Sequence, residues 1–369
     1  MPIRVLQICA SLSKGGGVQT VLQNYYEHMN QAEYIFDFVV MGTEIGELEK
    51  WFESRGSRVY HVTPRHISFK KNTTELKQII KSGNYDVVHC HQDYKSLIAI
   101  VIAGLYGVKT RVVHCHQAFP KESAKRRIVK RLSTFFIKCF ANVFIGCSKD
   151  AVKWLYGKRA LKSGKVIILN NAIDIEKYAF SENTRKQIRT ELKLGNKLVL
   201  GNVARITEVK NHKLLIDIFA TIYRQNDQSV LLLVGDGELA NETKCYCESL
   251  GLSESVVFLG ARSNVYELLS VMDVFVLTSR SEGLGLVIVE AQANGLPAVC
   301  SPFVPREVGM QRNVLFVPEN NYGNTEVWCS VIKKSLEIGR LEDTTVLTAV
   351  GYNIRKEAEK LEKIYEKKG

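Results

Sequence analysis

Two glutamates beside a glycine-containing loop are the most informative feature of this 369-residue sequence. Glu282 lies in the loop, and Glu290 lies about one turn inside the helix that the pattern predicts after it. Glycines let the backbone approach a ligand closely, and free N–H groups at a helix start favour phosphate. A nucleotide sugar carries hydroxyl-bearing rings on both sides of its diphosphate, so the spacing suits Glu290 on the ribose and Glu282 on a hexose. The loop positions expected to line this site are Gly283, Leu284, Gly285 and Leu286.

Two cations follow another strand-like run. Arg205 and Lys210 come just after residues 197–203. Fixed positive charge there can neutralise a diphosphate leaving group, which matters when no metal ion does so. By themselves the two residues also fit an exposed surface, so this signal gains weight only beside the glutamates.

Two further glycine turns stand where strands are predicted to end. The loop Gly15–Gly17 follows the first strand, but it lacks the G-x-G-x-x-G spacing and the acidic residue that reads a ribose. We therefore disfavour a dinucleotide site and expect only close backbone approach at Gly16 and Gly17. The turn at Gly235 either faces a nucleotide or is a plain tight turn between a strand and a helix.

Two histidine pairs end neighbouring predicted strands, as His89-Cys-His91 and His114-Cys-His116. Alternate residues of a strand point the same way, so each pair can converge, and the cluster raises a zinc hypothesis. The acidic ligands that a hydrolytic metal centre recruits are not grouped nearby. We favour His116 as a residue that contacts the sugar or the acceptor, with a hydrogen-bonded core histidine as the alternative.

Predicted strands and predicted helices alternate along the whole chain, and they must position these residues. β-branched runs separated by helical patterns predict parallel sheets covered on both faces. This alternation of strands and helices is interrupted once and then resumes. We therefore expect an α/β protein with two Rossmann-like domains that face a central cleft. The expected boundaries are a first domain at 1–174, a linker at 175–196, a second domain at 197–351, and a charged helix at 352–369 that either caps the second domain or crosses back to the first. The expected strands are Ile3–Cys9, Phe36–Val40, Asp86–Cys90, Arg111–His114, Asn142–Cys147, Lys165–Leu169, Lys197–Val203, Val230–Val234, Val256–Leu259, Asp273–Leu277, Ala298–Cys300 and Val314–Val317.

The composition restricts the class of protein and its partners. A net charge of +12 calls for an anionic partner, but the chain carries no recognised nucleic-acid module. The basic segment Lys121–Arg131 runs into apolar residues, which is typical of a helix on a membrane surface or of a solvated helix with one face on the core. Nine cysteines without a CxxC pair indicate reduced thiols, mostly in the core. We find no signal peptide and no apolar run of the about 20 residues that span a bilayer, and expect a cytoplasmic protein.

These motifs together resemble a known family. The pair Glu282 and Glu290, within Ser-Glu-Gly-Leu-Gly-Leu-Val-Ile-Val-Glu, resembles the E-x7-E signature of the retaining glycosyltransferases of family four, which have the GT-B fold. The likeness covers nearly the whole chain and is strongest to bacterial exopolysaccharide and capsule glycosyltransferases. One departure is Asn171-Ala172, where the family commonly has Asn-Gly. The other matching motifs are Gly15–Gly17, the two His-Cys-His strands, Cys147-Ser148, Asn170–Asp174, Arg205, Lys210 and Gly235–Glu238.

The resemblance implies a role for each site residue. In similar enzymes the first domain binds the acceptor, the second binds the donor, and the final helix at 352–369 packs back on the first. The implied roles are donor diphosphate for Arg205 and Lys210, ribose for Glu290, hexose for Glu282 with the amides near Gly283 and Leu284, the reacting centre for His116, phosphate approach for Gly16, and the base for the backbone near Arg262.

The resemblance also implies an activity. We expect transfer of a hexose, with retention, from a nucleotide diphosphate sugar, with UDP favoured, to a lipid-linked or oligosaccharide acceptor in cell-surface polysaccharide synthesis. Neither a metal nor another cofactor is expected, and the partners are the donor, the acceptor and an anionic membrane surface at the inner face of the plasma membrane. Two alternatives stay open: a metal-dependent hydrolase built on the two His-Cys-His strands, and a non-catalytic subunit that binds a nucleotide sugar.

Overall fold

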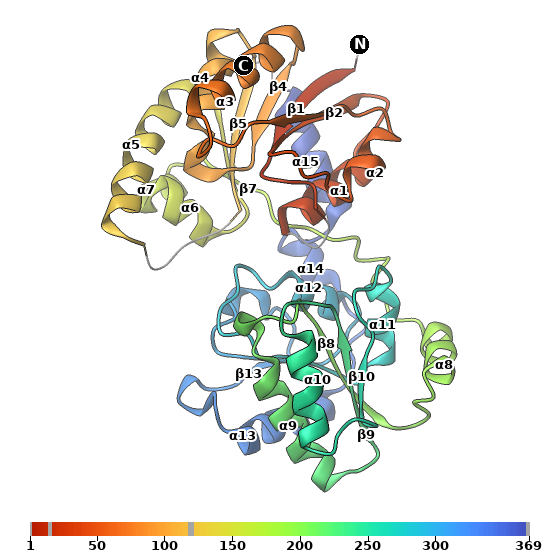
Figure 1. The fold of residues 1–369 in the computed structure, drawn as a ribbon. Helices are drawn as coiled ribbons and strands as arrows, with labels where there is room; N and C mark the ends of the chain where they lie inside the picture. The colour runs from red at the N-terminus through yellow and green to blue at the C-terminus, as the bar shows by residue number, and fades with distance from the viewer. Residues whose placement is uncertain (1, 14–16, 117–121, 367–369) are drawn as a thin grey trace. The chain divides into compact units, whose positions relative to one another are not determined.

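A computed structural model describes residues 2–13, 17–116 and 122–366 of the chain (Figure 1). The chain folds into two compact units. The first comprises the residues up to Ala172 together with those from Asn353 onward, and the second comprises Ile173–Tyr352. Gly16 lies outside the described residues.

The first unit is built on a parallel sheet. Within its described residues the sheet has seven strands, in the order β3-β2-β1-β4-β5-β6-β7. The order reverses between β1 and β4, which is where ligands bind to open sheets of this kind. The strands are β1 (Ile3–Ile8), β2 (Tyr34–Met41), β3 (Val59–Val62), β4 (Val87–Cys90), β5 (Thr110–Cys115), β6 (Val143–Gly146) and β7 (Ile167–Ile168).

Helices cover both faces of this sheet. One face packs on α1 (Gly17–His28), α2 (Glu49–Glu53) and α15 (Ile354–Glu366). The other packs on α3 (Phe69–Ser82), α4 (Leu97–Leu105), α5 (Ala124–Phe140) and α6 (Lys149–Tyr156). The short elements η1 (Asp93–Ser96) and α7 (Lys158–Lys162) lie between them in the sequence. Helix α15, drawn in blue, therefore lies beside α1 although the two are far apart in the chain (Figure 1).

The second unit, all of whose residues are described, repeats the plan. Its six parallel strands follow the order β10-β9-β8-β11-β12-β13. The strands are β8 (Leu198–Val203), β9 (Ser229–Val234), β10 (Val256–Phe258), β11 (Val274–Leu277), β12 (Ala298–Cys300) and β13 (Val314–Phe316). One face packs on α8 (Glu182–Glu191), α11 (Val265–Val271), α12 (Leu286–Ala293) and α14 (Thr345–Ala349), and the other on α9 (His212–Gln225), α10 (Ala240–Ser249) and α13 (Thr325–Ile338). Three short 3-10 turns complete it: η2 (Glu208–Lys210), η3 (Arg306–Val308) and η4 (Glu319–Asn321).

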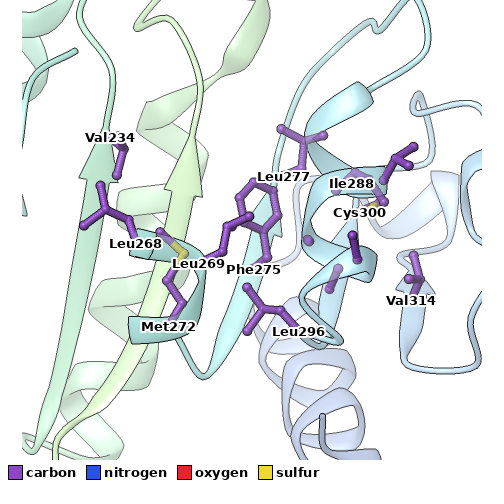
Figure 2. Packing of buried hydrophobic residues seen from close by; sticks show 14 of the residues in the cluster. Val234, Leu268, Leu269, Met272, Phe275, Leu277, Ile288, Leu296, Cys300 and Val314 are labelled. Atoms are coloured by element: carbon purple, nitrogen blue, oxygen red, sulfur yellow. The ribbon is translucent and has the colours of Figure 1, made fainter. Parts of the chain in front are cut away.

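The strands divide their side chains between the two cores. In β9, Val230, Leu232 and Val234 enter one core, and Leu231 and Leu233 enter the other. Alternation of this kind makes a strand that is buried on both faces read as a continuous apolar run. Figure 2 shows the first of these cores, in which Leu268 and Leu269 of α11 and Ile288 of α12 pack with Phe275 and Leu277 of β11.

The structure differs from the sequence-based expectation in two places. Strand β3 was not expected; it is an edge strand of four residues that pairs with β2 alone among the described strands. The stretch 175–196, expected as a linker, contains helix α8 and belongs to the second unit. Arg185 and Arg189 of α8 bind the Asp273 carboxylate at 2.5 and 2.7 Å, so this helix attaches through ion pairs as well as apolar contacts.

The final helix packs on the first unit. Ile354, Ala358, Leu361 and Tyr365 of α15 are buried in the core that includes α1 and α2. Their spacing places them on one face of a helix. The helix therefore brings residues from the end of the sequence to the sheet that begins it.

The departure from the family pattern at Asn171-Ala172 has a simple explanation. Glycine is required at a turn only where φ is positive. Among the described residues the non-glycine positions with positive φ are Asn84, Asp93, Lys193 and Asn211, so Ala172 is not strained. An alanine is compatible with this backbone.

Candidate active site

The glycine loop between β11 and α12 forms one wall of the site in the second unit. Gly285 caps α12 in the left-handed conformation, with φ +79°, which side chains rarely adopt. A Cβ added at Gly283 would meet nothing within 4 Å, so space beside that backbone is open. Leu284 is buried and anchors the loop in the core. Leu286 is the first residue of α12, whose free N–H groups favour an anion.

A cation and a carboxylate meet at this loop. The Lys210 ammonium donates to Glu282 Oε1 at 2.6 Å, and the Ser279 hydroxyl donates to the same oxygen at 2.6 Å. The Glu282 side chain is only 9% exposed and that of Lys210 is 25% exposed. Arg205, by contrast, is 75% exposed and pairs loosely with Glu238 at 3.7 Å. Two residues that the sequence singled out separately are therefore bonded to each other.

Glu290 occupies a different environment. Burial raises the pKa of its carboxyl to about 7, and a hydrogen bond with Tyr178 acts in the opposite direction. Tyr178 lies in the stretch that was expected to be a linker, so sequence reasoning missed it. Hydrogen bonds donated by ligand hydroxyl groups would stabilise the ionised form of this carboxyl.

The remaining predicted residues of this unit lie on turns at the same sheet edge. Gly235, with φ +135°, is packed so tightly that a Cβ would lie 2.0 Å from the Ala204 carbonyl oxygen, next to Arg205. Its N–H donates to the Gly260 carbonyl at 2.8 Å, which joins the turns after β9 and β10. Arg262 is exposed on the second of these turns. Because carboxyl ends of parallel strands share one edge, the structure gathers these positions there.

In the first unit a cavity of about 820 Å³ opens at the carboxyl ends of the strands. This volume lies within the range of about 300 to 1,000 Å³ that is typical of small-molecule sites. It lies beside Gly17, the first residue of α1, and beside His91. Burial raises the pKa of Asp93, another of its lining residues, to about 6. Its cationic lining residues are Arg65, Lys95 and Arg126, and His66 also lines it.

Arg65 is a candidate that the sequence did not reveal. Its guanidinium donates to the Asn72 side chain at 3.3 Å and to the Lys95 carbonyl at 2.5 Å. Its buried Nη2 has no hydrogen-bond partner among the described residues. Arg65 follows β3, and the missed strand is the signal that would have pointed to it.

The four histidines converge, as their spacing predicted. Ring nitrogens of His89, His91 and His114 lie within 4.8 Å of one another, close enough for one metal ion. The rings also hydrogen-bond to one another: His89 bonds to His114 at 3.2 Å and His91 bonds to His116 at 2.7 Å. Burial lowers the pKa of His116 to about 4, and it lowers the pKa values of His89, His91 and His114 well below the ordinary value of a histidine. We interpret the cluster as neutral, mutually hydrogen-bonded rings.

Helix α5 carries an unusual surface. Its sequence AKRRIVKRLSTFFIKCF contains six basic and no acidic residues. Large apolar side chains on it are exposed, Phe135 by 65% and Ile128 by 59%. The others are Val129, Leu132 and Phe136.

No helix in the described ranges is long and apolar enough to cross a membrane.

Comparison with known proteins identifies the family. One family model, Glycosyltransferase Family 4, matches residues 15–177, and another, Glycosyl transferases group 1, matches residues 183–323. The chain belongs to the family 4 type of glycosyltransferases. Each match falls within or close to one structural unit.

Individual relatives agree with this assignment. EpsF of Bacillus subtilis, which carries a glycosyltransferase name, is 28% identical over 98% of this chain and 96% of that protein. The UDP-Gal:alpha-D-GlcNAc-diphosphoundecaprenol alpha-1,3-galactosyltransferase of Escherichia coli is 32% identical over 77% of this chain and 76% of that protein. The structure of Anabaena Alr3699/HepE in complex with UDP is 20% identical, covers 99% of this chain and 98% of that one, and has a TM-score of 0.74. The glycosyltransferase therefore has the GT-B fold, and the alternative of a metal-dependent hydrolase is not supported.

Proposed function

We propose that this glycosyltransferase moves a hexose, with retention of configuration, from a UDP-sugar to a lipid-linked acceptor in cell-surface polysaccharide synthesis, without a metal ion. The observation that carries the proposal is the bonded pair of Lys210 and Glu282 beside the glycine loop and the start of α12. A cation for phosphate and an acceptor for sugar hydroxyls are both held there. The E. coli relative is named for transfer from UDP-Gal.

The donor would lie along the carboxyl edge of the second sheet. Its diphosphate would bind Lys210, Arg205 and the N–H groups of α12, while the ribose hydroxyls donate to Glu290. The hexose hydroxyls would donate to Glu282. The Lys210–Glu282 bond keeps both side chains beside the glycine loop before the donor arrives.

Transfer would follow a same-face path. The bond between the anomeric carbon and the phosphate oxygen breaks first, and the acceptor oxygen bonds to the anomeric carbon from the same side. The acceptor hydroxyl gives its proton to the departing phosphate. The protein supplies position and fixed charge, mainly that of Lys210. Glu282 binds ring hydroxyls in this scheme and forms no covalent bond.

The acceptor would bind in the cavity of the first unit. Its cationic lining suits a phosphate-bearing acceptor, and the unpaired Nη2 of Arg65 is a donor ready for an anion. Val129 lines this cavity and is also 45% exposed on α5. An acceptor whose diphosphate lies in the cavity could therefore extend its lipid along α5. The E. coli relative is named for a diphosphoundecaprenol acceptor.

The surface of α5 would rest on an anionic membrane. Its basic residues attract acidic lipid headgroups, and exposed Phe135 and Phe136 would enter the interface. The protein would then act at the inner face of the plasma membrane.

A nucleotide panel tests the donor proposal. Thermal unfolding is followed with UDP, GDP and ADP, all in EDTA, for the wild type, for Glu290→Ala and for Glu254→Ala, an exposed control on the loop before β10. UDP should raise the Tm of the wild type and the control, and raise it less for Glu290→Ala. A Tm that no nucleotide raises, or that UDP raises only with added metal, would contradict the proposal. Retention is checked by NMR of the anomeric proton in the first product.

A further inference from the structure

Two hydroxyl groups hold the turn that carries Lys210. Lys210 is the last residue of η2, and Asn211 lies between η2 and α9. The Thr278 hydroxyl donates to the carbonyl oxygens of Lys210 and Asn211, at 3.0 and 3.1 Å. The Tyr322 hydroxyl donates to the Thr278 carbonyl oxygen at 2.7 Å and accepts from Nδ2 of Asn211 at 2.8 Å. We call Thr278 and Tyr322 the hydroxyl pair.

The direction of each of these bonds is fixed by the groups that take part. A backbone carbonyl oxygen can only accept, so the hydroxyl proton of Thr278 points at the two carbonyls of the turn. The single hydroxyl proton of Tyr322 points at the Thr278 carbonyl for the same reason. The Tyr322 oxygen can then only accept from Asn211, so the amide of Asn211 presents its NH₂ group to it.

Asn211 has a backbone conformation that needs such support. Its φ is +52°, in the left-handed region that residues other than glycine rarely adopt. A residue in this region costs free energy and persists only where the surrounding contacts hold it. The hydroxyl pair supplies contacts to both its carbonyl and its side chain. Because Asn211 directly follows Lys210, a change in its conformation would redirect the backbone that carries the lysine.

Both members of the hydroxyl pair are themselves anchored. Thr278 follows β11 directly and is fully buried. The carbonyl oxygen of Tyr322 accepts from the indole N–H of Trp328 at 2.8 Å, and Trp328 is fully buried in one of the two cores of the second unit. The ring of Tyr322 packs on the same core. Such packing gives the pair the rigidity that a group must have to position another.

The turn is joined to the glycine loop by two further bonds. The backbone N–H of Arg280 donates to the Val209 carbonyl at 2.8 Å, and the Lys210 ammonium donates to Glu282 at 2.6 Å. The first of these bonds lies before Lys210 in the turn, and the hydroxyl pair holds the turn at Lys210 and after it. A single substitution in the pair therefore releases the second half of the turn and leaves the first half attached.

We propose that Thr278 and Tyr322 are positioning residues that hold the Lys210 ammonium where the diphosphate of the donor binds. The inference rests on the proposed function in giving Lys210 that role. A lysine side chain is a flexible four-carbon stem, so the place of its ammonium depends on the backbone that carries it. The hydroxyl pair makes no contact with the donor in this scheme and acts through Lys210.

Calorimetric titration with UDP and UMP, both in EDTA, tests this role. Tyr322→Phe should raise the Kd for UDP by about 5- to 20-fold, because the charged contact to the outer phosphate is weakened. The Kd for UMP, which lacks that phosphate, should stay unchanged. Thr278→Val should behave like Tyr322→Phe, whereas Thr278→Ser keeps the hydroxyl and should bind UDP like the wild type. An unchanged Kd for UDP in Tyr322→Phe and Thr278→Val, or an equal loss of affinity for UDP and UMP, would overturn the proposal.

A second titration asks whether the effect passes through Lys210. In a protein that already carries Lys210→Met, adding Tyr322→Phe should not weaken UDP binding further, because the group that it positions is gone. An equal loss with and without Lys210→Met would show a general structural effect and refute the positioning role. Tyr246→Phe is the matched control: its hydroxyl donates to Asp217 at 2.6 Å between α10 and α9, and its loss should leave the Kd for UDP unchanged.

Amide hydrogen exchange of the full chain without nucleotide reads the turn itself. Residues 205–211 should exchange faster in Tyr322→Phe and Thr278→Val than in the wild type and in Tyr246→Phe. Exchange at the wild-type rate in both variants of the pair would contradict the inference. Failure of the proposed function is distinguishable, because the wild type would then bind no UDP while the exchange measurement, which needs no ligand, would still show whether the hydroxyl pair holds the turn.

Discussion

Replacing Glu290 by glutamine should make the free enzyme more stable at alkaline pH. Burial raises the pKa of this carboxyl from 4.5 to about 7. An acid whose pKa is higher in the folded state stabilises that state fully below the unfolded pKa, and the contribution is lost as pH rises through the folded pKa. The interval from 4.5 to about 7, at about 1.36 kcal/mol per pH unit, amounts to about 3 kcal/mol at pH 8. Glutamine can keep the bond to Tyr178 and never ionises.

Urea denaturation at pH 5 and pH 8 measures this difference. The free energy of unfolding of Glu290→Gln relative to the wild type should increase by about 2 to 3 kcal/mol between the two pH values. Glu254→Gln, at an exposed position, should show no such change. A difference between Glu290→Gln and the wild type that does not grow with pH would refute the assignment of a partly buried, destabilising carboxylate.

Bound UDP should stabilise the wild type more than it stabilises Glu290→Gln. The ribose hydroxyls would donate to the ionised Glu290, and a hydrogen bond to a charged group contributes about 1.5 to 3 kcal/mol. Its loss in Glu290→Gln should raise the Kd for UDP by about 10- to 100-fold at pH 8. Isothermal titration calorimetry measures this, and an unchanged Kd would mean that the ribose does not reach this carboxylate.

Three further predictions concern the charged groups. Lys210→Met should lower kcat by about 100- to 1000-fold, because the leaving diphosphate loses its buried cation; steady-state transfer rates in EDTA check this, and a loss below 10-fold would contradict it. Glu282→Gln should bind UDP more tightly while transferring sugar more slowly, because Lys210 is released from its carboxylate partner at 2.6 Å; UDP that binds less tightly would show that the pair is needed for the phosphates. The double variant Phe135→Asp with Phe136→Asp should lose flotation with anionic liposomes, whereas Leu250→Asp in the second unit should float like the wild type.

The fold was largely predictable because its strands are buried on both faces. A strand such as β9, Ser-Val-Leu-Leu-Leu-Val, stands out in any sequence, and repeated strands with helices between them leave few topologies. Strand β3 lacked that signal, because an edge strand with exposed His61 is short and pairs on one side only. Helix α8 was hidden for another reason. Its attachment through Arg185 and Arg189 gives it the composition of a polar linker.

The donor-side residues were predictable individually but not as partners. A glycine loop, a glutamate after it and a lysine after another strand indicate phosphate and sugar binding by residue type alone. The bond between Lys210 and Glu282 depends on two turns that meet across 72 positions of the sequence. The contact between Tyr178 and Glu290 could not be predicted for the same reason, since nothing in a polar stretch identifies one tyrosine as the partner of this glutamate.

The cluster of four histidines shows where such inference from sequence stops. The two His-Cys-His runs predict, by strand alternation, that the rings share a face, and this is confirmed. Rings on one face suggest a metal centre until their remaining partners are known. Those partners are Gln7 and Tyr365, 358 positions apart, and neither belongs to a motif. Because a carboxamide and a phenol can each give one bond and accept one, they join the four rings into one hydrogen-bonded cluster. The hydrogen-bond partners of the rings therefore include residues at the two ends of the sequence.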